Sequence, residues 1–322
     1  MRRRGVMSRK RLRVLTWHVH GNYLYYLSQA PHDFFIVTKP HDPPGYAGRV
    51  GHLPWGDNVH EVPAECVRDT AFDCVLYQHQ RHYEHDRMFL LSDDQRALPT
   101  LFVEHDPPRG HPTDTLHPVQ DPNVLLVHVT PFNALMWDNG VTPTRVIEHG
   151  VLMPDNVEYR GTLPKGVTVV NNLARRGRRL GADLFEAVRH SVPLELVGMG
   201  STELGGIGEV PNPALPHFLS HYRFFFNPIR YTSLGLAVIE AMMIGMPIVA
   251  LATTEMALLV RSGRNGMADT RPAVLVDAMR MLIRDPELAR EWGAAARRDA
   301  CERFGIERFV RDWDAALHDV AT

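Results

Sequence analysis

The sequence predicts an α/β protein with two doubly wound, Rossmann-like domains that face each other across a cleft. Three observations support this fold class. The chain has 322 residues, which is enough for two ordinary domains. Short apolar runs alternate with helical stretches, and this order favours right-handed crossovers and parallel sheets. Glycines and prolines collect at 149–166, where helical periodicity stops, so we expect the seam between the domains there.

Ten apolar runs are expected to be strands, and several are apolar at successive positions, as in strands covered on both faces. They are 13–17, 34–37, 74–78, 100–104, 124–130, 145–147, 167–171, 194–198, 223–227 and 247–251. The stretch 39–55 is expected to be a surface loop near the edge of the first sheet. Beyond Thr270 we expect helices, with Pro286 in a first turn and Gly305 just past a helix end. The predicted domains are 1–152, completed by a C-terminal helix at about 306–322, and 153–305.

Composition narrows the function classes. Apolar residues make up 44%, charged residues 22%, and the formal net charge is −2, which gives no electrostatic case for nucleic acid as a partner. The odd count of three cysteines argues against a disulfide framework and favours a reducing, cytoplasmic compartment. The basic start, 1–17, has no apolar run of membrane-spanning or signal-peptide type. We expect a solvated tail, or sequence ahead of a start at Met7, with weak peripheral contact to anionic lipid at the inner membrane face as the alternative.

One carboxylate, Glu240, lies in an unusually apolar segment. The pattern predicts a strand at 223–227, a loop at 228–233 and a helix at 234–244 that Gly245 ends. Glu240 then lies about two turns into the helix, and no basic residue stands three or four positions away to pair with it. A buried ionised carboxylate needs partners, and a ligand with vicinal hydroxyls, such as a ribose, supplies two donors. A solvent-facing acid on an amphipathic helix is the alternative.

The segment TSLGLAVIEAMMIGMPIVA (232–250) resembles the EGFGLxxxEAMAxGxPVVA segment of retaining GT-B glycosyltransferases of family 4. The resemblance covers the C-terminal half well and the N-terminal half loosely. It implies a hexosyltransferase-type enzyme that moves a sugar from a nucleoside-diphosphate sugar to an acceptor hydroxyl with retention of configuration. The nucleotide would bind the C-terminal domain and the acceptor the N-terminal one. The other similar stretches are VIEHGV (146–151), 167–188, LVGMGS (196–201), SGRNGMADT (262–270) and the ending at 296–313.

The resemblance also implies roles for residues of the C-terminal half. Glu240 takes the place of the glutamate that binds the ribose hydroxyls. Thr232 stands eight positions earlier, where the family has a glutamate that contacts the donor sugar. Backbone amides at the start of the following helix are expected to hold the diphosphate through the helix dipole. The expected donor-side residues are Glu240, Thr232, Ser233, Leu234, Gly235, Leu236, Gly198 and Gly200.

The basic loop NNLARRGRRLG (171–181) follows a strand end and precedes a helix. In the family an arginine and a lysine clamp the diphosphate here. Asn172 stands at the arginine's place and Arg176 near the lysine's, with Arg178 and Arg179 as alternates. Guanidinium groups stabilise the charge on a leaving diphosphate, so Arg176 is expected to take part in catalysis. A solvated basic loop is the alternative.

Two strand ends of the first half carry further candidates. The loop after the first strand, WHVHGNY (17–23), contains His20, Gly21 and Asn22, which the resemblance places near the acceptor or the donor phosphates. His105 and Asp106 follow the strand at 100–104. The resemblance implies a histidine at this strand end near the donor sugar, so His105 is expected to hydrogen-bond the sugar or to share the proton transfer.

We predict no metal and no cofactor beyond the nucleotide-sugar substrate. A metal site of His105, Asp106, His111 and His117 is the weaker alternative, because their spacing matches no helical metal-binding motif. Two other functions stay open. One is a GT-B-fold nucleotide-sugar epimerase or phosphorylase, although such enzymes lack the 232–251 block. The other is a non-catalytic nucleotide-sugar binder, because Thr232 replaces the first glutamate. The acceptor is left open between a saccharide, a lipid-linked molecule and a small molecule.

Overall fold

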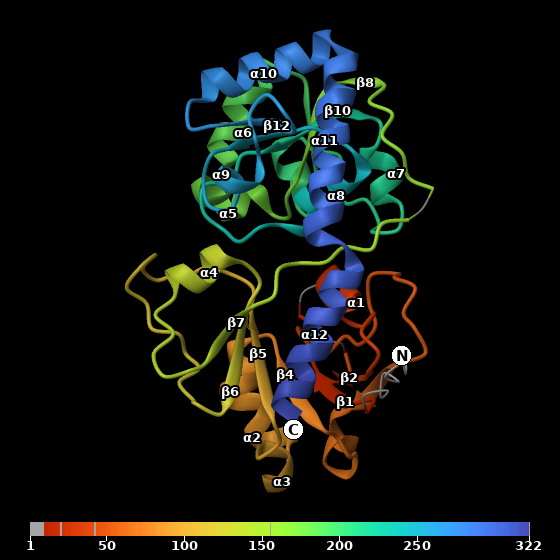
Figure 1. The fold of residues 1–322 in the computed structure, drawn as a ribbon, viewed down its shortest axis with the longest axis vertical. Helices are drawn as coiled ribbons and strands as arrows, with labels where there is room; N and C mark the ends of the chain where they lie inside the picture. Colours follow the sequence, from red (N-terminus) through yellow and green to blue (C-terminus); the bar gives the residue numbers. More distant parts are fainter. Residues whose placement is uncertain (1–9, 20, 42, 155, 322) are drawn as a thin grey trace, which may run out of the picture.

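The computed structural model describes residues 10–19, 21–41, 43–154 and 156–321. Two β-sheets form two lobes that meet along the long axis of the molecule (Figure 1). All strand pairs in both sheets are parallel, which confirms the predicted fold class. Within the described residues, no helix combines the length and the apolar character needed to cross a membrane.

The N-terminal lobe is built on a seven-stranded sheet with the order β3-β2-β1-β4-β5-β6-β7. Its strands are β1 (Arg13–Thr16), β2 (Asp33–Thr38), β3 (Val59–Pro63), β4 (Cys74–Tyr77), β5 (Thr100–Glu104), β6 (Val124–His128) and β7 (Thr144–Val146). Its helices are α1 (Gly21–Leu27), η1 (Ala64–Asp69), the π-helix η2 (His82–Asp86), α2 (Arg87–Leu90), α3 (Asp93–Arg96) and α4 (Pro131–Met136).

The C-terminal lobe is built on a five-stranded sheet with the order β12-β11-β10-β8-β9. Its strands are β8 (Leu163–Val169), β9 (Leu194–Val197), β10 (Tyr222–Asn227), β11 (Ile248–Leu251) and β12 (Gly266–Asp269). Its helices are α5 (Leu173–Leu180), α6 (Ala182–Arg189), η3 (Ser201–Leu204), α7 (Leu215–Leu219), α8 (Leu236–Ile244), α9 (Met256–Leu259), α10 (Pro272–Arg284) and α11 (Pro286–Phe304).

The last helix, α12 (Ile306–Ala321), returns the chain to the N-terminal lobe (Figure 1). Arg145 Nη2 donates to Asp319 Oδ2 at 2.9 Å, and the His318 ring lies 2.9 Å from the carbonyl of Lys10. Pro286 begins α11 and Gly305 follows its end, as predicted. The two lobes are therefore tied together by the linker at 147–162 and by the passage from α11 to α12.

The structure differs from the predicted elements at three places. Strand β3 was not predicted, because the sequence VHEVP is short, carries a charge and ends in proline. Strand β12 was not among the ten predicted strands and lies within SGRNGMADT (262–270). Strand β8 begins at Leu163, inside the predicted seam, where Gly166 suggested a loop. A Cβ on Gly166 would lie 2.2 Å from the Phe224 ring, so this glycine serves close packing within the strand.

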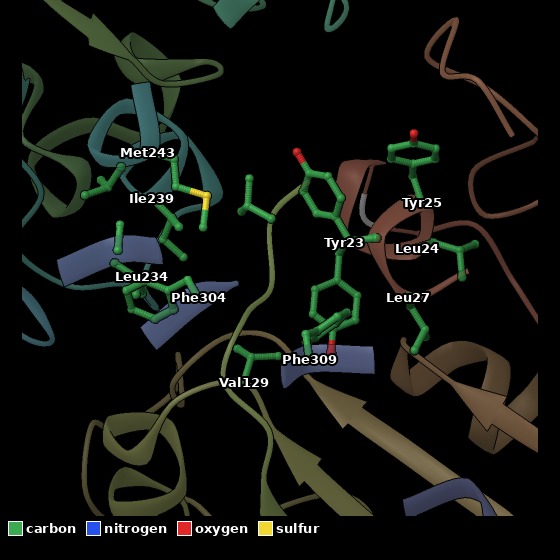
Figure 2. Packing of buried hydrophobic residues seen from close by; sticks show 14 of the residues in the cluster. Tyr23, Leu24, Tyr25, Leu27, Val129, Leu234, Ile239, Met243, Phe304 and Phe309 are labelled. Atoms are coloured by element: carbon green, nitrogen blue, oxygen red, sulfur yellow. The ribbon is translucent and has the colours of Figure 1, made fainter. Parts of the chain in front are cut away.

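One hydrophobic cluster continues from lobe to lobe. It joins residues of α1, such as Tyr23 and Leu24, to Ile239 and Met243 of α8. Figure 2 shows the α8 side chains on one side of the linker and those of α1 on the other, with Phe309 of α12 next to Tyr23. The Tyr23 and Phe309 rings meet edge to face at 5.6 Å. Shared burial of this kind stabilises the two lobes in contact.

Candidate active site

A cavity of about 580 Å³ lies between the lobes. It is lined by residues just past the carboxyl ends of parallel strands, where open α/β sheets bind ligands. Gly21 follows β1, Asn171 follows β8 and Gly198 follows β9. Apolar side chains of Val169, Val197, Val210 and Leu215 form one wall. A second cavity of about 390 Å³ adjoins the first and shares Asn22, Asn212 and Glu240 with it.

Glu240 lies where the two cavities meet. Every residue of α8 from Val238 to Ile244 is buried, and Glu240 itself is only 6% exposed. Its Oε1 accepts hydrogen bonds from Asn22 Nδ2 at 3.1 Å and from the Tyr26 hydroxyl at 2.9 Å. The solvent-facing alternative is therefore wrong. The expectation that a ligand supplies both donors is also corrected, because α1 of the other lobe supplies two.

Burial raises the pKa of Glu240, and the hydrogen bonds from Asn22 and Tyr26 act against that rise. The pKa of Tyr26 lies well above its usual range because of burial and the neighbouring carboxylate. The phenol thus stays protonated and remains a hydrogen-bond donor at physiological pH. A buried carboxylate with two fixed donors is suited to receive further donors from a ligand.

The start of α8 lies at the same cavity. The helix begins at Leu236, two residues later than predicted, because Gly235 has an extended backbone and caps it. Leu236 and Ala237 line the cavity, and the first amides of a helix have no intrahelical partner. Leu234 lies before the helix, and its side chain is buried in the core. This end of the cavity is therefore suited to an anionic group.

The other predicted donor residues lie at different distances from this cavity. Gly198 lines it, whereas Gly200 has a positive φ of 66° and precedes η3. Ser233 is buried, and its Oγ accepts from Asn133 Nδ2 of the N-terminal lobe at 3.2 Å. Thr232 is half-buried in the loop ahead of α8, and its side chain makes no hydrogen bond to a described residue.

The arginines of the basic loop differ in exposure and in their charged neighbours. Asn172 adopts a left-handed conformation (φ 53°) ahead of α5, and the non-helical backbone of Gly177 kinks the helix between Arg176 and Arg178. Arg178 is 76% exposed and pairs with Asp183 at 2.7 Å. Arg176 is half-buried, and its pKa is lowered by burial and by nearby Arg179. Arg176 is thus better placed than the exposed Arg178 to meet an anion, and Arg179, the other predicted alternate, is half-buried as well.

Asp106 of the N-terminal lobe lies close enough to the basic loop for its charge to raise the pKa of Arg176. It pairs with Arg109, a cation that the sequence analysis did not select. His105 lies half-buried beside it, with Nε2 3.2 Å from Gln78 Oε1. Since Gln78 Nε2 donates to the Trp17 carbonyl at 3.0 Å, its oxygen faces His105, and His105 Nε2 carries the proton.

A third cavity, of about 320 Å³, opens in the N-terminal lobe beside His105 and Asp106. Gln78, Glu104, Arg109 and Trp137 contribute to its wall. Such a mixture of planar polar groups and an aromatic ring is suited to a polyhydroxylated molecule. His20, predicted at this side of the cleft, lies outside the described residues.

Within the described part of the chain, His105, Asp106, His111 and His117 do not lie together in metal-ligand geometry. His117 Nε2 instead faces Glu104 Oε2 at 3.2 Å. Sequence reasoning missed Tyr26, although its position four residues after Asn22 places both on one face of a helix. It also missed Glu209 and Asn212, which line the cavity of about 580 Å³ and belong to no recognisable sequence motif.

Two Rossmann-like lobes with a ligand cavity between them define the GT-B class of fold. Residues 201–299 match the family model Glycosyl transferases group 1. Over this part the chain is similar to glycosyltransferases of group 1, and the match covers the block containing Glu240. No curated protein matches the sequence significantly.

Solved structures agree on the fold. Sucrose-phosphate synthase from Thermosynechococcus elongatus is 16% identical, with a TM-score of 0.65 over 96% of this chain and 99% of that one. HepE from Anabaena, solved with UDP and glucose, is 14% identical, with a TM-score of 0.66 over 96% and 100%. TarM from S. aureus, solved with UDP among other ligands, is 15% identical, with a TM-score of 0.62 over 79% of this chain. The chain spans 58% of the TarM chain.

Proposed function

We propose that the chain transfers a sugar from a nucleoside-diphosphate sugar to an acceptor hydroxyl with retention of configuration, and that the cavity between the lobes is the donor site. The observation that carries the proposal is Glu240. It is a carboxylate only 6% exposed, on a helix whose first residues line the same cavity of about 580 Å³. The solved structures of HepE and TarM with UDP support a nucleoside diphosphate as the ligand.

The cavity has a place for each part of such a donor. The ribose hydroxyls donate to Glu240, and the base lies along the wall of Val197, Val210 and Leu215. The diphosphate lies at the start of α8, between Gly21 and the basic loop. The sugar then lies beyond the diphosphate, toward Thr232 and His105. This order follows the chain's charges: an acceptor group at the ribose end, and amides and a guanidinium at the phosphate end.

The transfer itself needs few reacting groups from the protein. The bond between the anomeric carbon and the diphosphate oxygen breaks, and the acceptor oxygen bonds to the same face of the sugar. The acceptor's proton passes to the leaving diphosphate, whose charge Arg176 and the amides of α8 stabilise. The acceptor lies on the N-terminal side, in the cavity beside His105 and Asp106. Contact between the lobes excludes water that would otherwise hydrolyse the donor.

The test is to incubate the protein with a panel of UDP-, GDP- and ADP-sugars and a set of saccharide, lipid-linked and small-molecule acceptors. Release of the free nucleoside diphosphate is measured first, and the anomeric configuration of any product is read by proton NMR. We expect one base to be strongly preferred and the configuration of the donor to be kept. A protein that binds no nucleoside diphosphate at millimolar concentration contradicts the donor site, and an inverted product contradicts the mechanism.

A further inference from the structure

The carboxylate of Glu240 is held by a helix of the opposite lobe. Asn22 and Tyr26 are four residues apart on α1, so both side chains leave the same face of that helix. In sequence they lie 218 and 214 positions from Glu240. Only the contact between the lobes brings these three residues together. The Tyr26 side chain is 5% exposed, so its hydroxyl has few alternatives to this partner.

Both donors go to the same carboxylate oxygen. Asn22 Nδ2 and the Tyr26 hydroxyl lie 3.1 Å and 2.9 Å from Oε1, and no described residue donates to Oε2. A carboxylate oxygen has two lone-pair sites, so Oε1 is saturated while Oε2 keeps its acceptor capacity. Two fixed donors on Oε1 also fix the rotation of the carboxylate plane. Because Glu240 borders both interlobe cavities, the orientation of that plane decides where Oε2 meets a ligand.

The electrostatics favour the same arrangement. Burial raises the pKa of Glu240, while the bonds from Asn22 and Tyr26 lower it and so stabilise the ionised form. An ionised carboxylate is the stronger acceptor for hydroxyl donors. The two donors of the N-terminal lobe thus oppose the effect of burial on the pKa of Glu240.

We propose that Tyr26 is a positioning residue for the nucleotide: through Oε1 of Glu240 it presents Oε2 to the ribose hydroxyls, so that ribose recognition is complete only when the lobes are in contact. This inference rests on the proposed function, since it assigns the ribose to Glu240. Binding of the ribose and closure of the lobes are then linked, and each favours the other.

The experiment compares Tyr26→Phe with the wild-type protein by calorimetry. The ligands are the preferred nucleoside diphosphate and its 2′,3′-dideoxy analogue, which lacks the hydroxyls that Glu240 would accept. The matched control is Tyr25→Phe, because Tyr25 is the neighbouring buried tyrosine and its hydroxyl makes no hydrogen bond to a described residue. Near-UV circular dichroism checks that each variant keeps its packing.

We expect wild type to bind the ribonucleotide at least tenfold more tightly than the dideoxy analogue. Tyr26→Phe should weaken binding of the ribonucleotide about fivefold and leave binding of the analogue unchanged. The ratio of the two affinities should therefore decrease. In a Glu240→Ala background, Tyr26→Phe should have no further effect. An equal loss for both ligands in Tyr26→Phe, or an unchanged ratio, overturns the positioning role while the donor site stands. Failure of wild type to bind any nucleoside diphosphate overturns the donor site itself, and the positioning role with it.

Discussion

Replacement of Glu240 by alanine is the most direct test of the donor site. The variant removes the oxygen that we assign to the ribose, and it removes the Oε1 that accepts from Asn22 and Tyr26 at 3.1 Å and 2.9 Å. A lost hydrogen bond to a charged group costs about 1–3 kcal/mol. Nucleoside diphosphate affinity should therefore fall by about 5- to 150-fold.

Two effects on the free energy of unfolding act in opposite directions. The Tyr26 hydroxyl and the Asn22 amide lose their acceptor, which costs about 1–3 kcal/mol for a buried donor. A carboxylate whose pKa is raised by burial is removed, which is favourable at neutral pH. We therefore expect the loss of nucleotide affinity to exceed the loss of stability.

Calorimetry with UDP, GDP and ADP measures the affinity, and thermal unfolding without ligand measures the stability. Glu186→Ala is the matched control, because Glu186 is an exposed acid of the same lobe, on α6. It should leave both quantities unchanged. If Glu240→Ala binds the nucleotide within twofold of wild type while its unfolding transition is intact, the assignment of the ribose to Glu240 is refuted.

Four further predictions follow from the site and the core. Arg176→Gln should lower nucleoside diphosphate affinity and turnover about tenfold or more, whereas Arg178→Gln, which removes an exposed arginine, should leave both unchanged. If the two variants have equal effects in calorimetry and turnover assays, the placement of the diphosphate is contradicted. Thr232→Glu should change the rate of sugar transfer several-fold without changing the affinity for the free nucleotide. A higher transfer rate indicates that threonine weakens the native site, and a lower rate indicates that threonine itself contacts the donor sugar. A changed nucleotide affinity argues against a contact with the sugar. Nucleotide affinity should decline as pH falls through the pKa of Glu240, and at a higher pH than for an ordinary carboxyl, because burial raises that pKa; affinity that stays constant from pH 7 to pH 4 counts against an ionised partner. Burial lowers the pKa of His128 to about 4, whereas an exposed histidine in the unfolded chain titrates near pH 6.5. The free energy of unfolding therefore falls as pH drops from 6.5 toward 4, and at pH 5 the loss is about 2 kcal/mol. His128→Gln should remove this loss, which is measured as the difference between the unfolding free energies at pH 7 and pH 5.

The predicted elements show where local pattern is sufficient. Strand β10 was predicted at 223–227 from its three successive phenylalanines, and all six positions of the observed strand, 222–227, are buried. Strand β3 was missed because an edge strand need not be apolar on both faces. Gly166 misled the prediction, since a glycine that serves close packing with Phe224 has the same letter as one that serves a turn.

The site shows the same division. Glu240 was selected from its apolar neighbours and from its resemblance to a known segment, and both are properties of adjacent residues. The loop sequence named three arginines, and only in the structure do the exposure of Arg178 and its pairing with Asp183 distinguish it from Arg176.

By itself the sequence predicted the two-lobed α/β architecture and the burial of Glu240, and its motifs resemble those of one class of enzyme, because each of these rests on short-range periodicity and local motifs. Only the tertiary structure decided which groups hold that acid. Hydrogen bonds from Asn22 and Tyr26 reach Glu240 across more than two hundred positions of chain, and such a contact exists only after two separate sheets have folded and met. Local sequence pattern cannot predict such a contact, because packing between the lobes decides where side chains at the ends of unconnected strands lie.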